Sequence, residues 1–211
     1  MLTIENTETF GWEAAIRGMR SPKNSWDKSD SCWSSPYENG TDEPMYIIGE
    51  NDLKLMHTLA AAGQDHGKFL RMIHVQLDVT APLYWWKEAD QYKVGTVTDS
   101  CSTMHKIHAK EFDVNDFSHE HLVGASMKAL KAVIDAMNLE REHFVYTKDK
   151  DCWWQMIQLL PSSYNQRRTW DLNYAVLRNI YHARRNHKLD EWHTLCDWIE
   201  TLPYAKELIC G

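Results

Sequence analysis

The strongest cluster of groups that could bind a ligand lies in the segment RNIYHARRNHK, from Arg178 to Lys188. A guanidinium can hold a phosphate through two parallel hydrogen bonds, and an asparagine amide can bond a ribose or the edge of a base. On a helix, Arg178 and Arg185 would share one face, while Arg184 and Asn179 would lie on others or at its edge. The segment therefore indicates a phosphate or nucleotide site. The alternative is a cationic helix end that is stabilised by the macrodipole.

Histidine and cysteine side chains raise the question of a metal or a nucleophile. His105 and His108 have the spacing that places two imidazoles on one side of a helix. No nearby carboxylate completes this pair and the H-E-x-x-H pattern is absent, so we predict no metal site. Cys101 is one of five cysteines and is interpreted as a small buried residue rather than a nucleophile.

An aromatic segment, PLYWWKEADQYKVGTVTDSCSTMHKI, runs from Pro82 to Ile107. Trp85 and Trp86 argue against a disordered linker, and the threonines and serines that follow are unusual in a core strand. We interpret the segment as the wall of a pocket for a planar ligand that carries a phosphate, with the aromatic rings packing or stacking. Lys87 and Lys93 would supply positive charge, and the hydroxyl run would supply hydrogen bonds.

Hydrophobic periodicity predicts the elements that must position these groups. Alternation over Ile73–Val79 predicts a half-buried central strand, and a 3.6-residue period over Asn51–Ala61 predicts a helix. Further helices are expected at Trp12–Met19, His119–Met137, Asp151–Leu160, Trp170–Arg185 and Lys188–Leu202, with strands at Leu2–Phe10 and Met45–Ile48. A few strands combined with long helices indicate the α+β class.

Length and composition bound the domain organisation. A chain of 211 residues with 43% hydrophobic content can bury the core of one domain, or of two small ones that share a core. We predict a single α+β domain over residues 1–211. The stretch from 20 to 44 is rich in Ser, Asp, Pro and Gly, and it predicts a long loop over the pocket or at a subunit boundary.

Charge and hydropathy exclude several classes of protein. The formal net charge of −7 disfavours nucleic acid as a partner, so phosphate recognition must come from a local basic cluster. No run of eighteen apolar residues and no signal-peptide pattern is visible, which predicts no membrane association and a cytoplasmic protein. The odd number of cysteines, without a C-x-x-C pair, predicts reduced thiols.

The segment Leu160 to Trp192 resembles the C-terminal part of the flavin-dependent thymidylate synthases. In that pattern an asparagine follows a Leu-Pro proline by twelve residues, a second asparagine follows six later, and an arginine five beyond; Pro161, Asn173, Asn179 and Arg184 keep these intervals. The resemblance implies that Asn173 and Asn179 contact FAD and that Arg184 holds the nucleotide dUMP.

The upstream half is similar to the same family in layout. The segment AAAGQDHGKFLRMIHVQLDVTAP looks like its Gly-His segment and strand, so the resemblance implies a flavin contact for His66. The segment DSCSTMH looks like the end of the family signature, and Ser102 matches its serine at the nucleotide. The similarity covers about Leu53 to Leu202 and implies a thymidylate synthase-complementing protein-like fold, with a central mixed sheet flanked by long helices.

Three departures from the family pattern concern arginines and the final motif. The chain lacks the family's Arg-His-Arg triplet and has no arginine between Arg71 and Arg141, although Lys87 or Lys93 could replace a charge. Ile157 stands where the family has another arginine, and its Gln-Trp-Glu segment has become Asp-Glu-Trp. Each lost arginine removes a charge-assisted contact of about 1.5–3 kcal/mol.

The activity that the resemblance implies is the transfer of a one-carbon unit to dUMP by a homotetrameric flavoenzyme. FAD would be the cofactor, with NADPH and methylenetetrahydrofolate as co-substrates. Two alternatives remain open at this point. One is a non-catalytic nucleotide-binding protein on the same fold, and the other is an FAD enzyme that modifies a different pyrimidine nucleotide.

Overall fold

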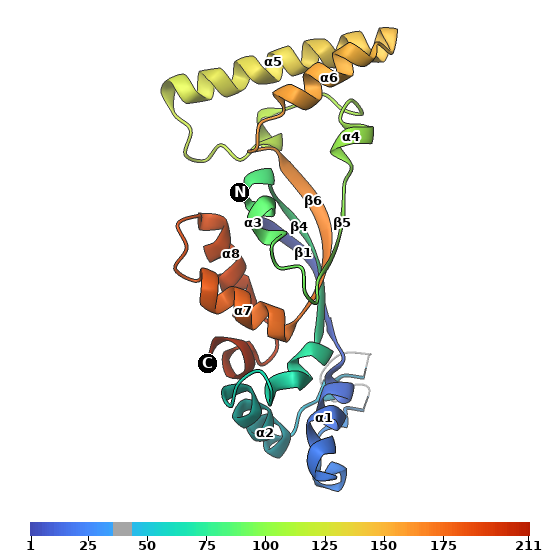
Figure 1. Ribbon diagram of the computed structural model, residues 1–211, viewed down its shortest axis with the longest axis vertical. Coiled ribbons are helices and arrows are strands. Elements are labelled where there is room, and N and C mark those ends of the chain that lie inside the picture. The colour runs from blue at the N-terminus through green and yellow to red at the C-terminus, as the bar shows by residue number, and fades with distance from the viewer. Residues whose placement is uncertain (36–43) are drawn as a thin grey trace. The chain divides into compact units, whose positions relative to one another are not determined.

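The computed structural model describes residues 1–35 and 44–211, which pack into two compact units (Figure 1). Unit 1 comprises Met1–Asn6, Leu77–Lys93 and Thr98–Trp170, and unit 2 comprises Thr7–Gln76, Val94–Val97 and Asp171–Gly211. The single domain over 1–211 stays a prediction. Residues 36–43 of the predicted loop lie outside the described residues.

A four-stranded antiparallel sheet has the strand order β1-β4-β6-β5. Its strands are β1 (Thr3–Phe10), β4 (His74–Pro82), β5 (Val97–Ser100) and β6 (Asn165–Asn173). Strand β4 buries Val75, Leu77, Val79 and Ala81 at alternate positions, as the alternation predicts. The α+β class and the central position of this strand are confirmed, with an antiparallel sheet in place of the mixed sheet expected.

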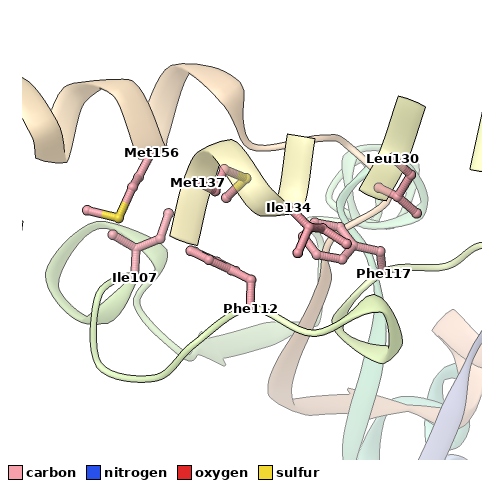
Figure 2. Close-up of a cluster of buried hydrophobic side chains, with 7 residues drawn as sticks. All are labelled: Ile107, Phe112, Phe117, Leu130, Ile134, Met137 and Met156. Atoms are coloured by element: carbon pink, nitrogen blue, oxygen red, sulfur yellow. The ribbon is translucent and has the colours of Figure 1, made fainter. Parts of the chain in front are cut away.

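Unit 1 contains a pair of adjacent helices, α5 (Gly124–Thr147) and α6 (Lys150–Leu159) (Figure 1). Lys148, with φ 60°, ends α5 in the left-handed conformation, and the Asp149 carboxylate caps α6 by accepting from the Asp151 N–H. Figure 2 shows the buried side chains beneath the pair: Ile107, Phe112, Phe117, Leu130, Ile134, Met137 and Met156. The shorter helices of this unit are α3 (Leu83–Ala89), α4 (Thr103–Lys106) and the 3-10 turn Val114–Asp116.

The tryptophans of the aromatic segment belong to the core of unit 1. Trp85 and Trp86 on α3 are 0% and 1% exposed, and both pack edge-to-face against Trp170 of β6. The Trp86 indole N–H donates to the Gln166 carbonyl oxygen, and the Arg168 guanidinium lies 4.2 Å from the Trp86 ring centroid. Other side chains cover both rings, so the expected stacking of these rings on a planar ligand was wrong. Val94 and Gly95 of the same segment do line a cavity, which is described below.

Unit 2 is mainly helical. Its helices are α1 (Trp12–Arg20), α2 (Glu50–Ala61), α7 (Tyr174–Arg184) and α8 (Asp190–Ile199), with a 3-10 helix, η3, at Gly67–Met72 and a π-helical turn at Lys206–Cys210. The short strands β2 (Cys32–Trp33) and β3 (Tyr46–Ile47) pair antiparallel, with Trp33 opposite Tyr46. The predicted helices over α1 and α2 and the short strand at β3 are confirmed.

A buried carboxylate orders the described part of the 20–44 segment. Asp52 on α2 is 0% exposed and forms an ion pair with Arg20, with 2.6 Å between Oδ1 and Nε. The hydroxyls of Ser29 and Ser31 donate to the other carboxylate oxygen, Oδ2. The 3-10 turns Ser21–Lys23 and Trp26–Lys28 precede this anchor, so the described part of the segment is held against α2.

Three predicted helix boundaries needed correction. The helix expected at Trp170–Arg185 begins only at Tyr174, since Trp170 and Leu172 face the core at strand period within β6. The helix expected at His119–Met137 runs instead from Gly124 to Thr147. The last predicted helix, Lys188–Leu202, is shorter, at Asp190–Ile199. Within the described chain, no helix combines the length and the apolar character that spanning a membrane requires.

Candidate functional site

Unit 2 contains a cavity of about 530 Å³. Its walls come from the end of α2, the turn that follows it, η3, the pair Val94–Gly95 and the cavity side of α7. A volume between about 300 and 1,000 Å³ is typical of sites for small molecules and cofactors. The cavity is therefore the candidate site of this unit.

Asn173 lies at the junction of β6 and α7 and is 6% exposed. Its Oδ1 accepts from the Val176 N–H at 3.1 Å, which caps α7, and its Nδ2 donates to the Gly95 carbonyl oxygen at 3.4 Å. The side chain is thus fixed from both ends while it lines the cavity. The cap explains why the helix begins directly after this residue.

Gly95 makes the close approach of Asn173 possible. Its φ is +77°, and a Cβ at this position would lie 2.9 Å from the Asn173 Nδ2 atom. A larger residue would be strained in its backbone and would also displace the amide. The geometry of Asn173 therefore depends on a glycine that is remote in sequence.

Asn179 and two arginines supply further polar groups. Asn179 is exposed and lies on the cavity side of α7, together with Arg178 and His182. Arg71, from η3, is exposed and also lines the cavity. Among the described residues that line it there is no Asp or Glu, so the charged groups in its wall are cationic.

Apolar side chains form the remainder of the wall. They include Ala60, Leu70, Val94, Ala175 and Val176. An apolar surface with a few fixed polar groups is suited to a planar ring system with hydrogen-bonding edges. Amides for such edges and guanidiniums for an anionic group match the donor set that a flavin or a nucleotide requires.

Arg184 is the last residue of α7 and is half-buried. Its guanidinium lies over the Trp192 ring of α8, 4.9 Å from the centroid. This is a cation–π arrangement that orients the side chain. Arg184 is not among the residues that line the cavity, in contrast to Arg178.

The remaining residues from the sequence prediction lie elsewhere in the two units. His66 is exposed at the start of η3, next to the cavity-lining Gly67. Ser102 caps α4 in unit 1, where its hydroxyl accepts from the His105 N–H at 3.0 Å. Lys87, on α3, and Lys93 are exposed in unit 1. Of the predicted set, the structure thus brings Asn173 and Asn179 to one cavity.

A group of possible metal ligands and two thiols with raised pKa values lie apart from the residues that line the cavity. Glu140, His143 and Cys152 place potential metal-ligand atoms within 4.8 Å of one another, a group of three that the sequence did not suggest. Burial raises the pKa of the Cys152 thiol. In unit 2, burial raises the pKa of Cys196 to about 11. These two thiols are therefore protonated at neutral pH and are poor nucleophiles.

Sequence reasoning missed Arg71 and Gly95 as residues of the site. Arg71 is an isolated arginine before a strand, and Gly95 is one glycine in a polar run. Both residues line the same cavity as α7, which is distant from them in sequence. The usable signal was the scarcity of arginine, because Arg71 is the last one before Arg141.

Comparison with proteins of known structure shows which fold the chain adopts. No family model and no curated protein sequence matches the chain. Two crystal structures of ThyX, the flavin-dependent thymidylate synthase of Helicobacter pylori, with FAD and dUMP, are similar at a TM-score of 0.70. Their identities to this chain are 14% and 15%, over 99% and 98% of this chain and 97% of each neighbour.

The fold is ThyX-like. A third neighbour, the UMP/dUMP methylase PolB from Streptomyces cacaoi bound with 5-Br dUMP, has a TM-score of 0.64 at 13% identity, over 100% of this chain and 95% of the neighbour. At such identities the likeness establishes the ThyX-like fold and leaves activity to be argued from the residues of this chain.

Proposed function

We propose that this chain is a flavin-dependent enzyme that acts on a pyrimidine nucleotide of the dUMP class, with a folate one-carbon donor. The observation that carries the proposal is the cavity beside α7, which holds both Asn173 and Asn179 within a ThyX-like fold. The neighbours of that fold contain FAD with dUMP, or a dUMP analogue.

The residues of the cavity fit a flavin. The buried Asn173 amide is held in one orientation, and apolar side chains offer a surface against which a ring can pack. Asn173 and Asn179 would hold the cofactor, with His66 beside the cavity as a further contact. Bound FAD would supply the redox chemistry of the reaction.

The chain's own contribution is positioning and electrostatics. Fixed amides orient a ligand without a cost of reorganisation at the moment of reaction. We propose Arg184, Ser102, Lys87 and Lys93 as the groups for the nucleotide, with NADPH and methylenetetrahydrofolate as co-substrates. No side-chain nucleophile is required by this assignment, which agrees with the raised pKa values of Cys152 and Cys196.

The first measurement tests whether the protein binds a flavin. Protein purified without added cofactor should be yellow, or should become so on reconstitution with FAD, and should bind dUMP in a calorimetric titration. With methylenetetrahydrofolate and NADPH, the complex should convert dUMP to its 5-methyl product. Protein that binds neither FAD nor a pyrimidine monophosphate would refute the proposed function.

Two alternatives have specific support. The missing Arg-His-Arg triplet favours a non-catalytic nucleotide binder, which would bind dUMP but yield no methylated product. The PolB neighbour, a UMP/dUMP methylase, favours an FAD enzyme with a different pyrimidine substrate. Parallel assays with dUMP, UMP, dCMP and CMP separate these outcomes.

A further inference from the structure

The cavity of unit 2 has an excess of positive charge. Arg71 and Arg178 both line it, and no carboxylate does so among its described lining residues. The chain as a whole carries a formal net charge of −7, so this local sign is opposite to that of the molecule. A cavity lined by one sign of charge attracts a ligand of the opposite sign.

Arg71 and Arg178 differ from most other arginines of the described chain, because neither forms an ion pair with an Asp or Glu side chain within it. Five arginines elsewhere form ion pairs with carboxylates: Arg17, Arg20, Arg167, Arg168 and Arg185. Arg178 instead donates to the carbonyl oxygen of Leu208 and to an oxygen of Gly211, the last residue of the printed sequence, each at 2.9 Å. These bonds fix its guanidinium at the cavity wall.

The Arg71 side chain forms neither a hydrogen bond nor an ion pair within the part of the chain that the structure describes. A solvated arginine on an open surface would need no explanation. Arg71, however, lies in the wall of a cavity that a second guanidinium, that of Arg178, also lines. Its five N–H donors are therefore available to a ligand at this position.

We infer that Arg71 is the phosphate-recognising residue of this cavity, with Arg178 as a fixed second cation. This inference rests on the proposed function and adds to it the group that binds the ligand's anionic part. The ligand chemistry is a phosphate or diphosphate ester attached to a planar ring. Its source is either the diphosphate of FAD or the monophosphate of the nucleotide.

The experiment compares ligands with and without phosphate. FAD, riboflavin, dUMP and deoxyuridine are titrated into the wild type, Arg71→Ala and Lys68→Ala. Lys68 is the matched control, because it is an exposed cation on the same 3-10 helix and does not line the cavity. Circular dichroism melting verifies that each variant is folded, as expected for exposed positions.

We expect Arg71→Ala to weaken the phosphate-bearing ligand about tenfold or more and to leave its phosphate-free analogue unchanged. A loss confined to FAD assigns the diphosphate, and one confined to dUMP assigns the monophosphate. Lys68→Ala should bind every ligand as the wild type does.

Two results would overturn the inference while the proposed function stands: unchanged affinity of Arg71→Ala for both FAD and dUMP, or equal losses for a ligand and its phosphate-free analogue.

If the wild type binds none of the four ligands, the proposed function fails, and inorganic pyrophosphate becomes the probe. If the wild type binds pyrophosphate and Arg71→Ala does not, the result would support an anion site at Arg71 independently of the proposed function. Absence of that binding, or its persistence in the variant, would refute the site.

Discussion

At the scale of single residues, the absence of a side chain at Gly95 allows the Asn173 amide to take its position in the cavity wall. In Gly95→Ala, the new Cβ would contact the Asn173 Nδ2 atom, and the positive φ would cost about 1–2 kcal/mol of stability. We expect FAD affinity to fall about tenfold as the amide shifts, measured by fluorescence titration. Gly124→Ala is the control, since Gly124 also has a positive φ but no atom lies within 4 Å of the position that a Cβ would occupy there. Equal FAD affinity in both variants would show that Asn173 does not depend on Gly95.

The ion pair of Arg20 and Asp52 is a second residue-scale feature, with consequences for stability. Asp52→Asn would leave the buried Arg20 charge uncompensated, so we expect a loss of about 3–5 kcal/mol in the free energy of unfolding. Urea denaturation followed by circular dichroism measures this loss. Asp27→Asn, an exposed position in the same segment, should change little. A loss below about 1 kcal/mol for Asp52→Asn would contradict the assignment.

The same carboxylate makes stability depend on pH. Burial alone would raise the pKa of Asp52, but hydrogen bonds from Ser29, Ser31 and Arg20 outweigh it and hold the pKa below its usual value. The unfolded chain therefore binds this proton more readily. The stabilisation is present above the ordinary carboxyl pKa and is lost as the pH falls through the lowered value. Asp52→Asn should correspondingly show a shallower loss of stability in acid than the wild type.

At the scale of elements, the cap of α7 allows stability and ligand binding to be separated. Asn173→Asp keeps an oxygen for the Val176 N–H and adds a charge that favours a helix N-terminus, so α7 should remain stable. It loses the amide donor and places an anion in a cationic cavity. We expect FAD or dUMP affinity to fall at least tenfold, with a smaller loss of melting temperature than in Asn173→Ala, because the helix cap is kept while the new carboxylate oxygen faces the Gly95 carbonyl oxygen. Wild-type affinity in this variant would exclude Asn173 as a ligand contact.

The comparison variant for that cap is Asn173→Ala. It removes both the cap and the donor, and the cap alone is worth about 0.5–2 kcal/mol. This variant should therefore lose stability as well as affinity. A melting temperature equal to that of the wild type would show that the observed hydrogen bond to Val176 does not stabilise α7.

Elements with strong periodicity could be predicted from sequence, and those at transitions could not. Ile73–Val79 alternates cleanly and is the inner strand β4. Trp170–Asn173 was assigned to a helix because the following residues have a helical pattern, whereas Trp170 and Leu172 face the core of the sheet. Trp85 and Trp86 were misplaced because sequence alone does not distinguish a ring buried in a core from a ring that lines a pocket.

The same limit applies to the site. Asn173 and Asn179 could be found because their interval along the chain resembles a known pattern, and both line the cavity. Arg71 and Gly95 could not, since only the tertiary fold brings them to the same cavity as α7. Roles that rest on the interval alone, such as that of Arg184, remain proposals.

At the scale of the whole molecule, the prediction is a homotetramer. Large apolar side chains on the surface are available for subunit contacts, among them Trp33 at 57% exposed and Met45 at 56%. Size-exclusion chromatography with light scattering should give a mass near four times 24.7 kDa. A monomer at micromolar concentration would contradict a site assembled from several chains.

The exposed guanidinium of Arg71 also affects how the protein should be purified. Arg71 is exposed to solvent, so dissolved ions screen its attraction for an anionic ligand. The screening length falls from about 10 Å at 0.1 M to about 3 Å at 1 M ionic strength. If Arg71 holds the diphosphate of FAD, a concentrated salt wash should remove flavin and leave colourless protein, whereas a dilute buffer should retain the flavin.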